Sequence, residues 1–537
     1  MDWRTVAFLV VTALPMAAAG DYVGSAVCSG CHKKLFDDYS RTAMGRAASH
    51  TVEHLQLAPQ KITIGNEKFQ RSFEVYAENG KLYQSEVGAD FRNVHELAYG
   101  IGSGVNGLSF AVRRGDHLFQ APLSYYSRAR SWGLSPGYEF ADYGFNRPIA
   151  GACIACHSGR PNPVAGRNGQ YADPPFDELS IGCESCHGPG KEHVRKGGAK
   201  AAIVNLSRLP AERAEDVCMN CHQGGDTRVV QPGKSLQDFR PGQVLNETVA
   251  IFKIPRTPGV ATDVDLLEHH ESMRLSKCFQ RSAGTQNSMN CIGCHNPHAA
   301  KTDYRAVCVG CHKTQLAATH QPKTSDCVGC HMPKREVGFI AHSALTNHRI
   351  IRTKDQPLPA SAFAQTTKDL PDVVHFNRVA GKTLPLVTLL QAYGELLERQ
   401  PQYYERFQTV LDEAAKKSPD QPLVWASLGR RALRAKSIDE AIGYLNKAVA
   451  LGLESSPTFE DLGEALALAG RLDEAVKVLE RGIEVAPYSA NLHKSLALRN
   501  IKLQKFPEAK LALERYVELF PEDDFVRRLL KQVSGAR

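Results

Sequence analysis

Residues 291–331 read CIGCHNPHAAKTDYRAVCVGCHKTQLAATHQPKTSDCVGCH, and the pentapeptide Cys-x-x-Cys-His occurs in them three times. It occurs seven times in the 537-residue chain and uses all but one of the fifteen cysteines. The copies are Cys28/Cys31/His32, Cys153/Cys156/His157, Cys183/Cys186/His187, Cys218/Cys221/His222, Cys291/Cys294/His295, Cys308/Cys311/His312 and Cys327/Cys330/His331. Two thiols at this spacing can each form a thioether with a haem vinyl group, while the following histidine binds the iron. The motifs therefore predict seven covalent c-type haems, each with its motif histidine as the proximal iron ligand.

Zinc sites and disulfides are the alternatives for paired cysteines. Cys-x-x-Cys segments also build tetrahedral zinc sites, but zinc does not require a histidine directly after every second cysteine. A disulfide framework in an exported protein leaves that histidine unexplained as well. The histidine at all seven positions therefore favours haem. The fifteenth cysteine, Cys278, could be an iron ligand, a reactive thiol or a buried small apolar residue, and we favour the last.

The start of the chain predicts export. Residues 1–4 carry little net charge, residues 6–14 are apolar, and Ala17, Ala18 and Ala19 form the small-residue pattern that export peptidases cleave. We expect a signal peptide at 1–19, with an uncleaved anchor as the alternative, and a periplasmic or extracellular mature protein. No later segment is apolar enough over a sufficient length to cross a membrane. The net charge of +8 is spread along the chain without a polybasic block, so nucleic acid is not an expected partner.

The chain divides into three parts after this leader. Residues 20–351 hold all seven motifs, residues 352–386 form a linker rich in proline and polar residues, and residues 387–537 have helical periodicity. In the last part Leu428, Leu462 and Leu496 recur every 34 residues, the period of tetratricopeptide repeats. We predict an all-α solenoid of one degenerate and three regular repeats, closed by a capping helix at about 525–533.

The motif-bearing part has too little polypeptide between motifs to build an ordinary core, so porphyrins must supply much of its buried apolar surface. We predict a mostly irregular and helical domain packed around the haems. Residues 61–87 alternate apolar and polar side chains around Glu78-Asn79-Gly80, which indicates a hairpin. This hairpin and a similar segment at 97–123 predict a small β-rich insert at about 60–125.

The ligand on the other side of each iron decides what that iron can do. A second strong ligand makes an electron carrier, whereas an open position permits substrate chemistry. The candidate distal ligands are Met44, His95, His193, His269, His298, His320, His342 and His348. His270 is the alternative to His269, and His50 or His54 could replace Met44. Ligation by Met44 would raise the potential of the first haem relative to a haem with two histidines.

Several short phrases resemble a family of exported multihaem c-type cytochromes with C-terminal tetratricopeptide repeats, distantly like nitrifier tetrahaem cytochromes and pentahaem nitrite reductases. They are YVGS at 22–25, CHGPG at 186–190, CHNPH at 294–298, CHMP at 330–333 and HSALTNHRI at 342–350. The resemblance implies that His193, His298 and His342 are distal ligands. The tetrahaem relatives have a histidine at the position of Met44. Pentahaem nitrite reductases carry Cys-x-x-Cys-Lys at the catalytic haem, and this sequence has no such motif, so that activity is not implied.

These features predict an electron-transfer protein in which about seven covalent haems connect redox partner proteins, and we favour a carrier over a catalyst. The repeats would dock a protein or peptide partner, or a second copy of the chain. Association with a membrane would come through a quinol-oxidising or outer-membrane partner. The first alternative is a reductase of a small nitrogen or oxyanion substrate at one five-coordinate haem. The second is a redox sensor that acts through its repeats.

Overall fold

The computed structural model describes residues 19–141, 143–258, 268–285, 288–312, 326–336, 344–353, 356–363 and 365–535. All seven Cys-x-x-Cys-His motifs fall within these ranges. The predicted signal peptide, apart from Ala19, and the candidate ligands His320 and His342 lie outside them.

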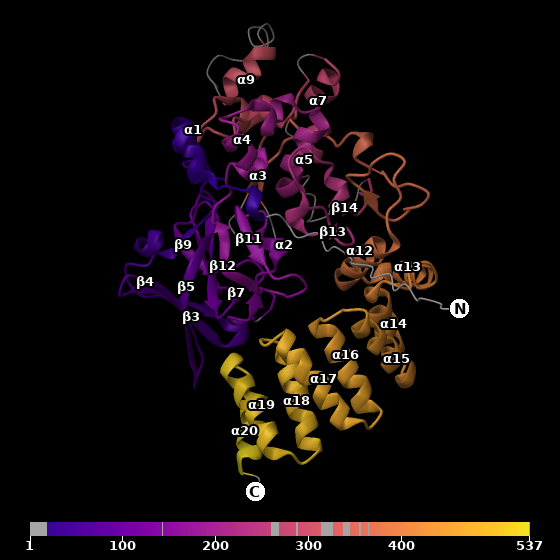
Figure 1. The fold of residues 1–537 in the computed structure, drawn as a ribbon. Helices are drawn as coiled ribbons and strands as arrows, with labels where there is room; N and C mark the ends of the chain where they lie inside the picture. The colour runs from indigo at the N-terminus through magenta and orange to yellow at the C-terminus, as the bar shows by residue number, and fades with distance from the viewer. Residues whose placement is uncertain are drawn as a thin grey trace, which may run out of the picture.

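An antiparallel sheet of ten strands forms the N-terminal side of the molecule (Figure 1). The strands are β1 (Ala48–His50), β2 (Ile62–Asn66), β3 (Arg71–Glu78), β4 (Lys81–Val87), β5 (Arg92–Ile101), β6 (Gly107–Arg114), β7 (His117–Gln120), β8 (Leu123–Tyr126), β9 (Ser131–Leu134) and β10 (Arg147–Pro148). The main path runs β10-β7-β6-β5-β4-β3-β2, with β1 on β5 and the β8–β9 pair on β6. The predicted hairpin is confirmed as β3–β4, and its turn residues Asn79 and Gly80 have φ of 50° and 75°, as a type I′ turn requires.

The segment from Ser25 to His375 that carries the motifs is built from short helices and small sheets. Its helices are α1 (Ser25–Tyr39), α2 (Gly151–Ile154), α3 (Glu184–His187), α4 (Lys191–Arg195), α5 (Ala211–His222), α6 (His269–Arg274), α7 (Lys277–Ser282), α8 (Cys291–Cys294), α9 (Tyr304–Cys311) and α11 (Cys327–His331). Its further strands are β11 (Arg160–Pro163), β12 (Tyr171–Glu178), β13 (Thr227–Val230), β14 (Val249–Lys253), β15 (Lys334–Glu336), β16 (Ala344–Thr346) and β17 (Val374–His375). Each motif begins within or at the start of a short helix.

The prediction of a mostly irregular and helical N-terminal part with a small β insert was wrong about the amount of strand. The first sheet runs from Ala48 to Pro148, and β11 pairs with β12 as far as Glu178. The missed strands have two to eight residues and include prolines, as in the RPNP of β11. Tertiary packing holds these strands in place, and their residues do not alternate between apolar and polar. The sequence therefore shows no strand period in these segments.

Four pairs of antiparallel helices and a final helix form the C-terminal solenoid. They are α12 (Leu386–Arg399) with α13 (Tyr404–Lys417), α14 (Pro422–Arg434) with α15 (Ile438–Ala450), α16 (Ser456–Leu468) with α17 (Leu472–Val485), α18 (Ala490–Lys502) with α19 (Phe506–Leu519), and α20 (Asp524–Gly535). A Cβ on Gly429 would lie 2.5 Å from Leu445, and one on Gly463 would lie 2.8 Å from Leu479. The helix pairs fit the predicted repeat, and its small residues allow the close approach of the helices.

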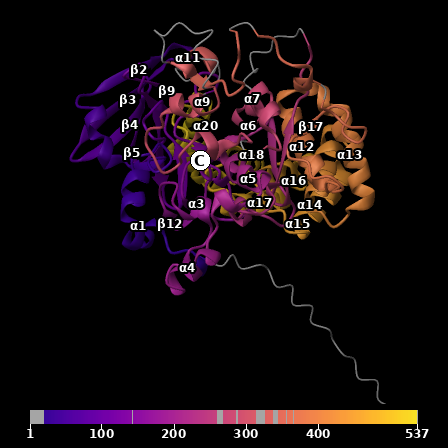
Figure 2. The same ribbon diagram turned by 90° about the horizontal axis from the view of Figure 1, so that it is seen from above.

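Both ends of the solenoid contact the N-terminal half of the chain. At the first end, Leu390 and Tyr393 of α12 share a hydrophobic core with Val229 of β13 and Phe252 of β14. At the other end, the Asn146 side-chain amide donates to the Leu519 carbonyl at 2.7 Å. The solenoid therefore curves from the motif region back to the large sheet (Figure 1). Seen from above, strands β2–β5 and helices α12–α13 lie on opposite sides of the motif helices (Figure 2).

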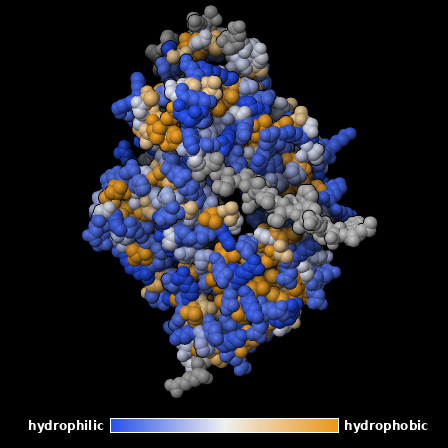
Figure 3. All heavy atoms as spheres, viewed as in Figure 1, coloured by the Kyte–Doolittle hydropathy of each residue, from blue (hydrophilic) through white to orange (hydrophobic). Residues whose placement is uncertain are grey.

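On the face shown in Figure 3, hydrophobic residues are scattered among hydrophilic ones over both halves of the molecule. Among the described residues, no helix combines the length and the apolar character that a membrane span requires.

Candidate haem-iron sites

Four motif histidines face a histidine from outside the motifs. We number the motifs as sites 1 to 7 in chain order. The ring centres are 6.3 Å apart for His32 and His193 at site 1, and 5.8 Å for His187 and His298 at site 3. They are 6.0 Å apart for His222 and His269 at site 4, and also for His295 and His348 at site 5. The planes of the paired rings differ by 15°, 8°, 21° and 31° in the same order. His193, His269, His298 and His348 are all predicted distal candidates.

These separations fit an iron ion held between two imidazoles. A metal–imidazole nitrogen bond measures about 2.0–2.1 Å, and a five-membered ring with bonds of about 1.33 Å has a radius of about 1.1 Å. Two imidazoles bound from opposite sides would therefore have centres about 6.3 Å apart. Direct stacking of two rings would bring them closer. The four pairs thus have the spacing that c-type haem with two axial histidines requires.

Part of the predicted haem-attachment set is exposed in the polypeptide. The exposed cysteines are Cys31, Cys153, Cys311 and Cys330, and the exposed motif histidines are His32, His157, His222, His295 and His312. The polypeptide alone does not bury these side chains. The physical reason is the short spacing of the motifs, which leaves too few residues to cover their helices.

Exposure of a motif thiol is compatible with haem attachment, because a thioether forms only at a sulfur that the porphyrin can reach. Cys31 lies on α1 and Cys330 on α11, and His312 directly follows α9. Burial of these three side chains would have to come from the apolar face of the porphyrin. Attachment at Cys31 and Cys330 and iron ligation by His312 therefore stay predictions.

Backbone carbonyls fix the tautomer of several of the better covered histidines. The Nδ1–H groups of His187, His193 and His348 donate to the carbonyls of Val204, Ala199 and Thr346 at 2.8, 3.0 and 2.9 Å. At site 7, His331 Nδ1 likewise donates to the Ile351 carbonyl at 2.7 Å. A hydrogen bond of this kind leaves Nε2 with its lone pair free for a metal and orients the ring.

Other histidines use Nε2 within the protein and are poorly placed to bind iron. Nε2 of His270 lies 2.8 Å from the Glu215 carboxylate, and Nε2 of His54 lies 2.6 Å from the Ser49 hydroxyl. His375 and His493 bond through Nε2 to Asn246 and to the Pro487 carbonyl. Of the two alternatives at the start of α6, it is His269 that faces a motif histidine.

His95 lies in the large sheet, on strand β5, and not beside a motif imidazole. Its ring packs 4.4 Å from that of Phe145, and its Nε2 is buried without a hydrogen-bond partner. Burial, assisted by the charge of Arg114, lowers the pKa of His95 to about 4. The ring is therefore neutral and belongs to the sheet core, so we do not carry His95 forward as a distal ligand.

The two imidazoles that face the motif histidines of sites 4 and 5 lie against each other. The ring centres of His269 and His348 are 4.2 Å apart. Burial, with the nearby His348, lowers the pKa of His269 to about 3, and burial also lowers the pKa of His348. Both rings are therefore neutral at physiological pH, which is the form that binds a metal.

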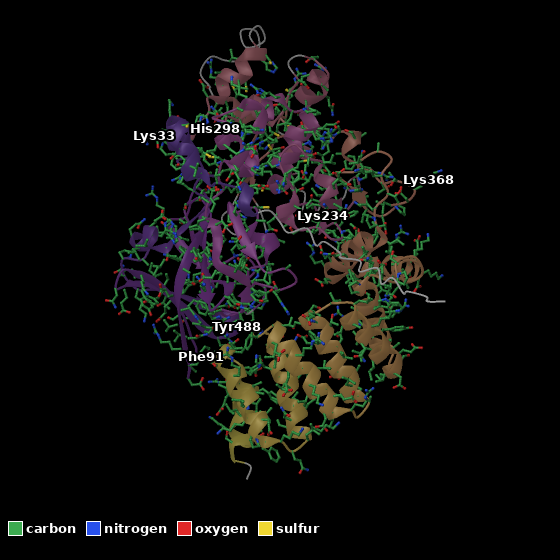
Figure 4. The ribbon with its side chains drawn as sticks, viewed as in Figure 1. Lys33, Phe91, Lys234, His298, Lys368 and Tyr488 are labelled. Carbon is green, nitrogen blue, oxygen red and sulfur yellow. The ribbon has the colours of Figure 1, made fainter. Side chains whose placement is uncertain are left out.

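A buried carboxylate that the sequence analysis missed joins site 1 to site 3. Glu184 is 2% exposed and accepts hydrogen bonds from the backbone N–H groups of Val23, Gly24 and Gly190 at 2.7–3.1 Å. Site 3 is the only motif with a charged residue between its cysteines, and this is the signal that could have found it. Figure 4 shows α1, with Lys33, beside the labelled His298.

Met44, His157 and Cys278 are the other residues that the sequence singled out near the motifs. Met44 is half-buried in the turn after α1, where its carbonyl accepts from the Ala47 N–H at 3.1 Å. At site 2, His157 has an exposed ring, yet the surrounding protein lowers its pKa through desolvation. Cys278 is half-buried in α7, and burial raises the pKa of its thiol.

Comparison with known proteins supports a haem-binding role for these motifs. No protein-family model matches the chain. It is 30% identical over 226 residues to the multiheme cytochrome MtrA of Shewanella baltica, and this match covers 39% of the chain and 61% of MtrA. The chain resembles multihaem cytochromes. It is also 24% identical over 234 residues to the C-type polyheme cytochrome OmcB of Geobacter sulfurreducens, over 38% of the chain and 30% of OmcB. The chain thus spans less than two thirds of the length of either relative.

Solved structures similar to part of the chain include a TPR domain and the MamA protein. The Arabidopsis OM64 TPR domain is 13% identical, with a TM-score of 0.21, over 22% of this chain and 96% of that domain. The MamA protein is 18% identical, with a TM-score of 0.25, over 28% of this chain and 80% of MamA.

Proposed function

We propose that this chain is an exported multihaem c-type cytochrome that transfers electrons through seven covalently bound haems. The four imidazole pairs carry the proposal, because each joins a motif histidine to a second histidine at the separation that one iron requires. Iron with two strong axial ligands is suited to electron transfer and not to substrate binding. The similarity to MtrA and OmcB supports the same chemistry.

The cysteines of each motif, the exposed Cys31 and Cys330 included, would hold the haem through thioethers, and the motif histidine would be the proximal ligand. His193, His298, His269 and His348 would be the distal ligands at sites 1, 3, 4 and 5. The position of His193 favours it over Met44 at site 1. His320 and His342, which lie outside the described residues, remain candidates for sites 2, 6 and 7.

The solenoid would dock a redox partner, and the protein would work in the periplasm or outside the cell. Contacts with the chain's own sheets already occupy both ends of the solenoid. Between these ends, Glu454 pairs with Arg167 of the N-terminal half at 3.1 Å. The surface of α14 to α17 away from this ion pair is the part that we propose for a protein or peptide partner or for self-association. A quinol-oxidising or outer-membrane partner would bring the protein to a membrane.

Site 2 supports a second candidate function, reduction of a small nitrogen or oxyanion substrate. His157 has an exposed ring, and within the described ranges no imidazole is recorded at a ligand's distance from it. If no residue completes that iron, site 2 would be the place where a small molecule binds.

Titration of the haem-loaded protein with cyanide, nitrite and carbon monoxide separates the two functions. Electron transfer alone predicts low-spin spectra that none of these ligands changes. A ligand-induced change equal to one haem, lost in Cys153→Ala/Cys156→Ala and kept in Cys327→Ala/Cys330→Ala, would favour catalysis at site 2. Changes at sites 1, 3, 4 and 5 would overturn the paired-histidine proposal.

A further inference from the structure

The order of the sites in space differs from their order in the sequence. Site 1 docks on site 3 and not on site 2. The Ser25 hydroxyl accepts from the Cys183 N–H at 2.9 Å. The Tyr39 hydroxyl donates to the Ile181 carbonyl at 2.8 Å. The distal histidine of site 1, His193, comes from α4, directly after site 3.

Sites 3, 4 and 5 contact one another in all three combinations. His298, which follows site 5, faces His187 of site 3. Between sites 4 and 5, the rings of His269 and His348, which face the motif histidines of these two sites, have centres 4.2 Å apart. Between sites 3 and 4, Cys186 packs on a hydrophobic core that includes Val217 and Met219 of α5. These three sites therefore form a central cluster.

Site 2 joins this cluster through site 4. The Cys156 thiol donates to the carbonyl of Asn220, which lies between the two cysteines of site 4, at 3.6 Å. Site 2 precedes site 3 in the chain, yet its thiol contact is with the motif that follows site 3.

Sites 6 and 7 extend from site 5. The Tyr304 hydroxyl at the start of α9, the helix of site 6, lies 3.2 Å from Nδ1 of His295 at site 5, and α8 contacts α9. Site 7 follows, because α9 contacts α11. In Figure 1, α1 and α9 lie at separate outer edges of the motif region.

We propose that the seven sites form a branched array with three ends. Sites 3, 4 and 5 form a central triangle, and site 1, site 2 and the site 6–site 7 pair are three arms attached to sites 3, 4 and 5. This inference rests on the proposed function, since it needs a haem at each motif. It goes further, because a branched array connects three redox partners where a linear wire connects two. Each transfer moves one electron from the donor to the acceptor, and no bond is made or broken.

The direct test locates the seven irons in crystals of the haem-loaded protein by anomalous scattering at the iron edge. The branched array predicts that irons 3, 4 and 5 are mutual neighbours, that iron 1 neighbours iron 3, and that iron 2 neighbours iron 4. A linear order with iron 2 between irons 1 and 3 would overturn it. Protein without covalent haem, detected by intact mass, would instead overturn the proposed function, so the two failures are distinguishable.

A kinetic test uses a photosensitiser attached to Lys33→Cys in a Cys278→Ala background. The Lys33 side chain is 80% exposed and lies next to His32, so a flash would deliver an electron at site 1. The variant Cys153→Ala/Cys156→Ala removes site 2. In this variant the electron should still leave site 1 rapidly. The matched variant Cys183→Ala/Cys186→Ala, which removes site 3, should lose this rapid transfer. The opposite pattern would overturn the branched array. Intact mass verifies that each variant lacks one haem, and the iron positions decide the question if the site 3 variant does not fold.

Discussion

Replacing Glu184 with alanine should release site 1 from site 3. Its carboxylate accepts three backbone hydrogen bonds, from Val23, Gly24 and Gly190. A hydrogen bond to a charged group contributes about 1.5–3 kcal/mol. The bonds to Val23 and Gly24 are only partly buried, so water can replace the carboxylate there. Each of these two bonds therefore contributes an energy near the lower end of that range. We expect a loss of about 3–5 kcal/mol in the free energy of local opening.

Hydrogen exchange of the haem-loaded protein measures this loss directly. Each 1.4 kcal/mol is a factor of about ten, so amides of residues 19–45 should exchange about 100- to 4000-fold faster in Glu184→Ala. Cyanide should also bind to an amount of iron equal to one haem, because His32 and His193 are no longer held in register.

Glu192→Ala is the matched control. Glu192 lies in α4 with His193, but it is exposed and pairs only with Arg195 and Lys196 of its own segment. It should change neither exchange nor cyanide binding. Equal behaviour of the Glu184 and Glu192 variants would refute the role of Glu184 in joining the two sites.

Three further predictions concern packing, the closure of the solenoid and site 1. Gly429→Ala should lower the free energy of unfolding of the solenoid by the cost of overpacking, about 1–3 kcal/mol, and its melting temperature should fall. Gly443→Ala in α15, with open space around its Cβ position, should raise the melting temperature slightly. Equal shifts in the two variants would contradict the packing. Tyr488, whose hydroxyl donates to the Arg114 carbonyl and whose ring lies 4.7 Å from the Arg114 guanidinium, holds the far end of the solenoid to the sheet (Figure 4). Tyr488→Ala should therefore increase the radius of gyration by small-angle scattering, and an unchanged radius would contradict this. His193→Met should raise the potential of one haem, whereas Met44→Leu should leave all potentials unchanged; the reverse pattern would restore Met44 as the ligand of site 1.

Haem attachment at the motifs and the helical repeats could both be predicted from the sequence, because both depend on the spacing of residues close together in the chain. Thioether attachment fixes the interval between two cysteines and a histidine, and a helix pair fixes the recurrence of Leu428, Leu462 and Leu496. The distal partners depend on tertiary structure instead. His298 lies three residues after His295, yet it faces His187 of another motif. Sequence proximity therefore singled out His298 as a candidate ligand but could not say which motif histidine it faces.

The size of the large sheet also depends on contacts distant in sequence. Strand β1 has three residues, Ala48 to His50, and pairs with Tyr99 to Ile101 of β5. Such a short strand has no readable alternation and exists only because β5 offers a free edge to it. The hairpin around Asn79-Gly80 was predictable because its turn residues and its alternation lie in one continuous segment.

Intact-mass analysis of the protein produced in a host that attaches c-type haem tests the central claim most directly. We predict the mass of the polypeptide plus seven haems, retained after denaturation because the thioethers are covalent. A bare polypeptide, or one that carries zinc at the paired cysteines, would contradict the claim.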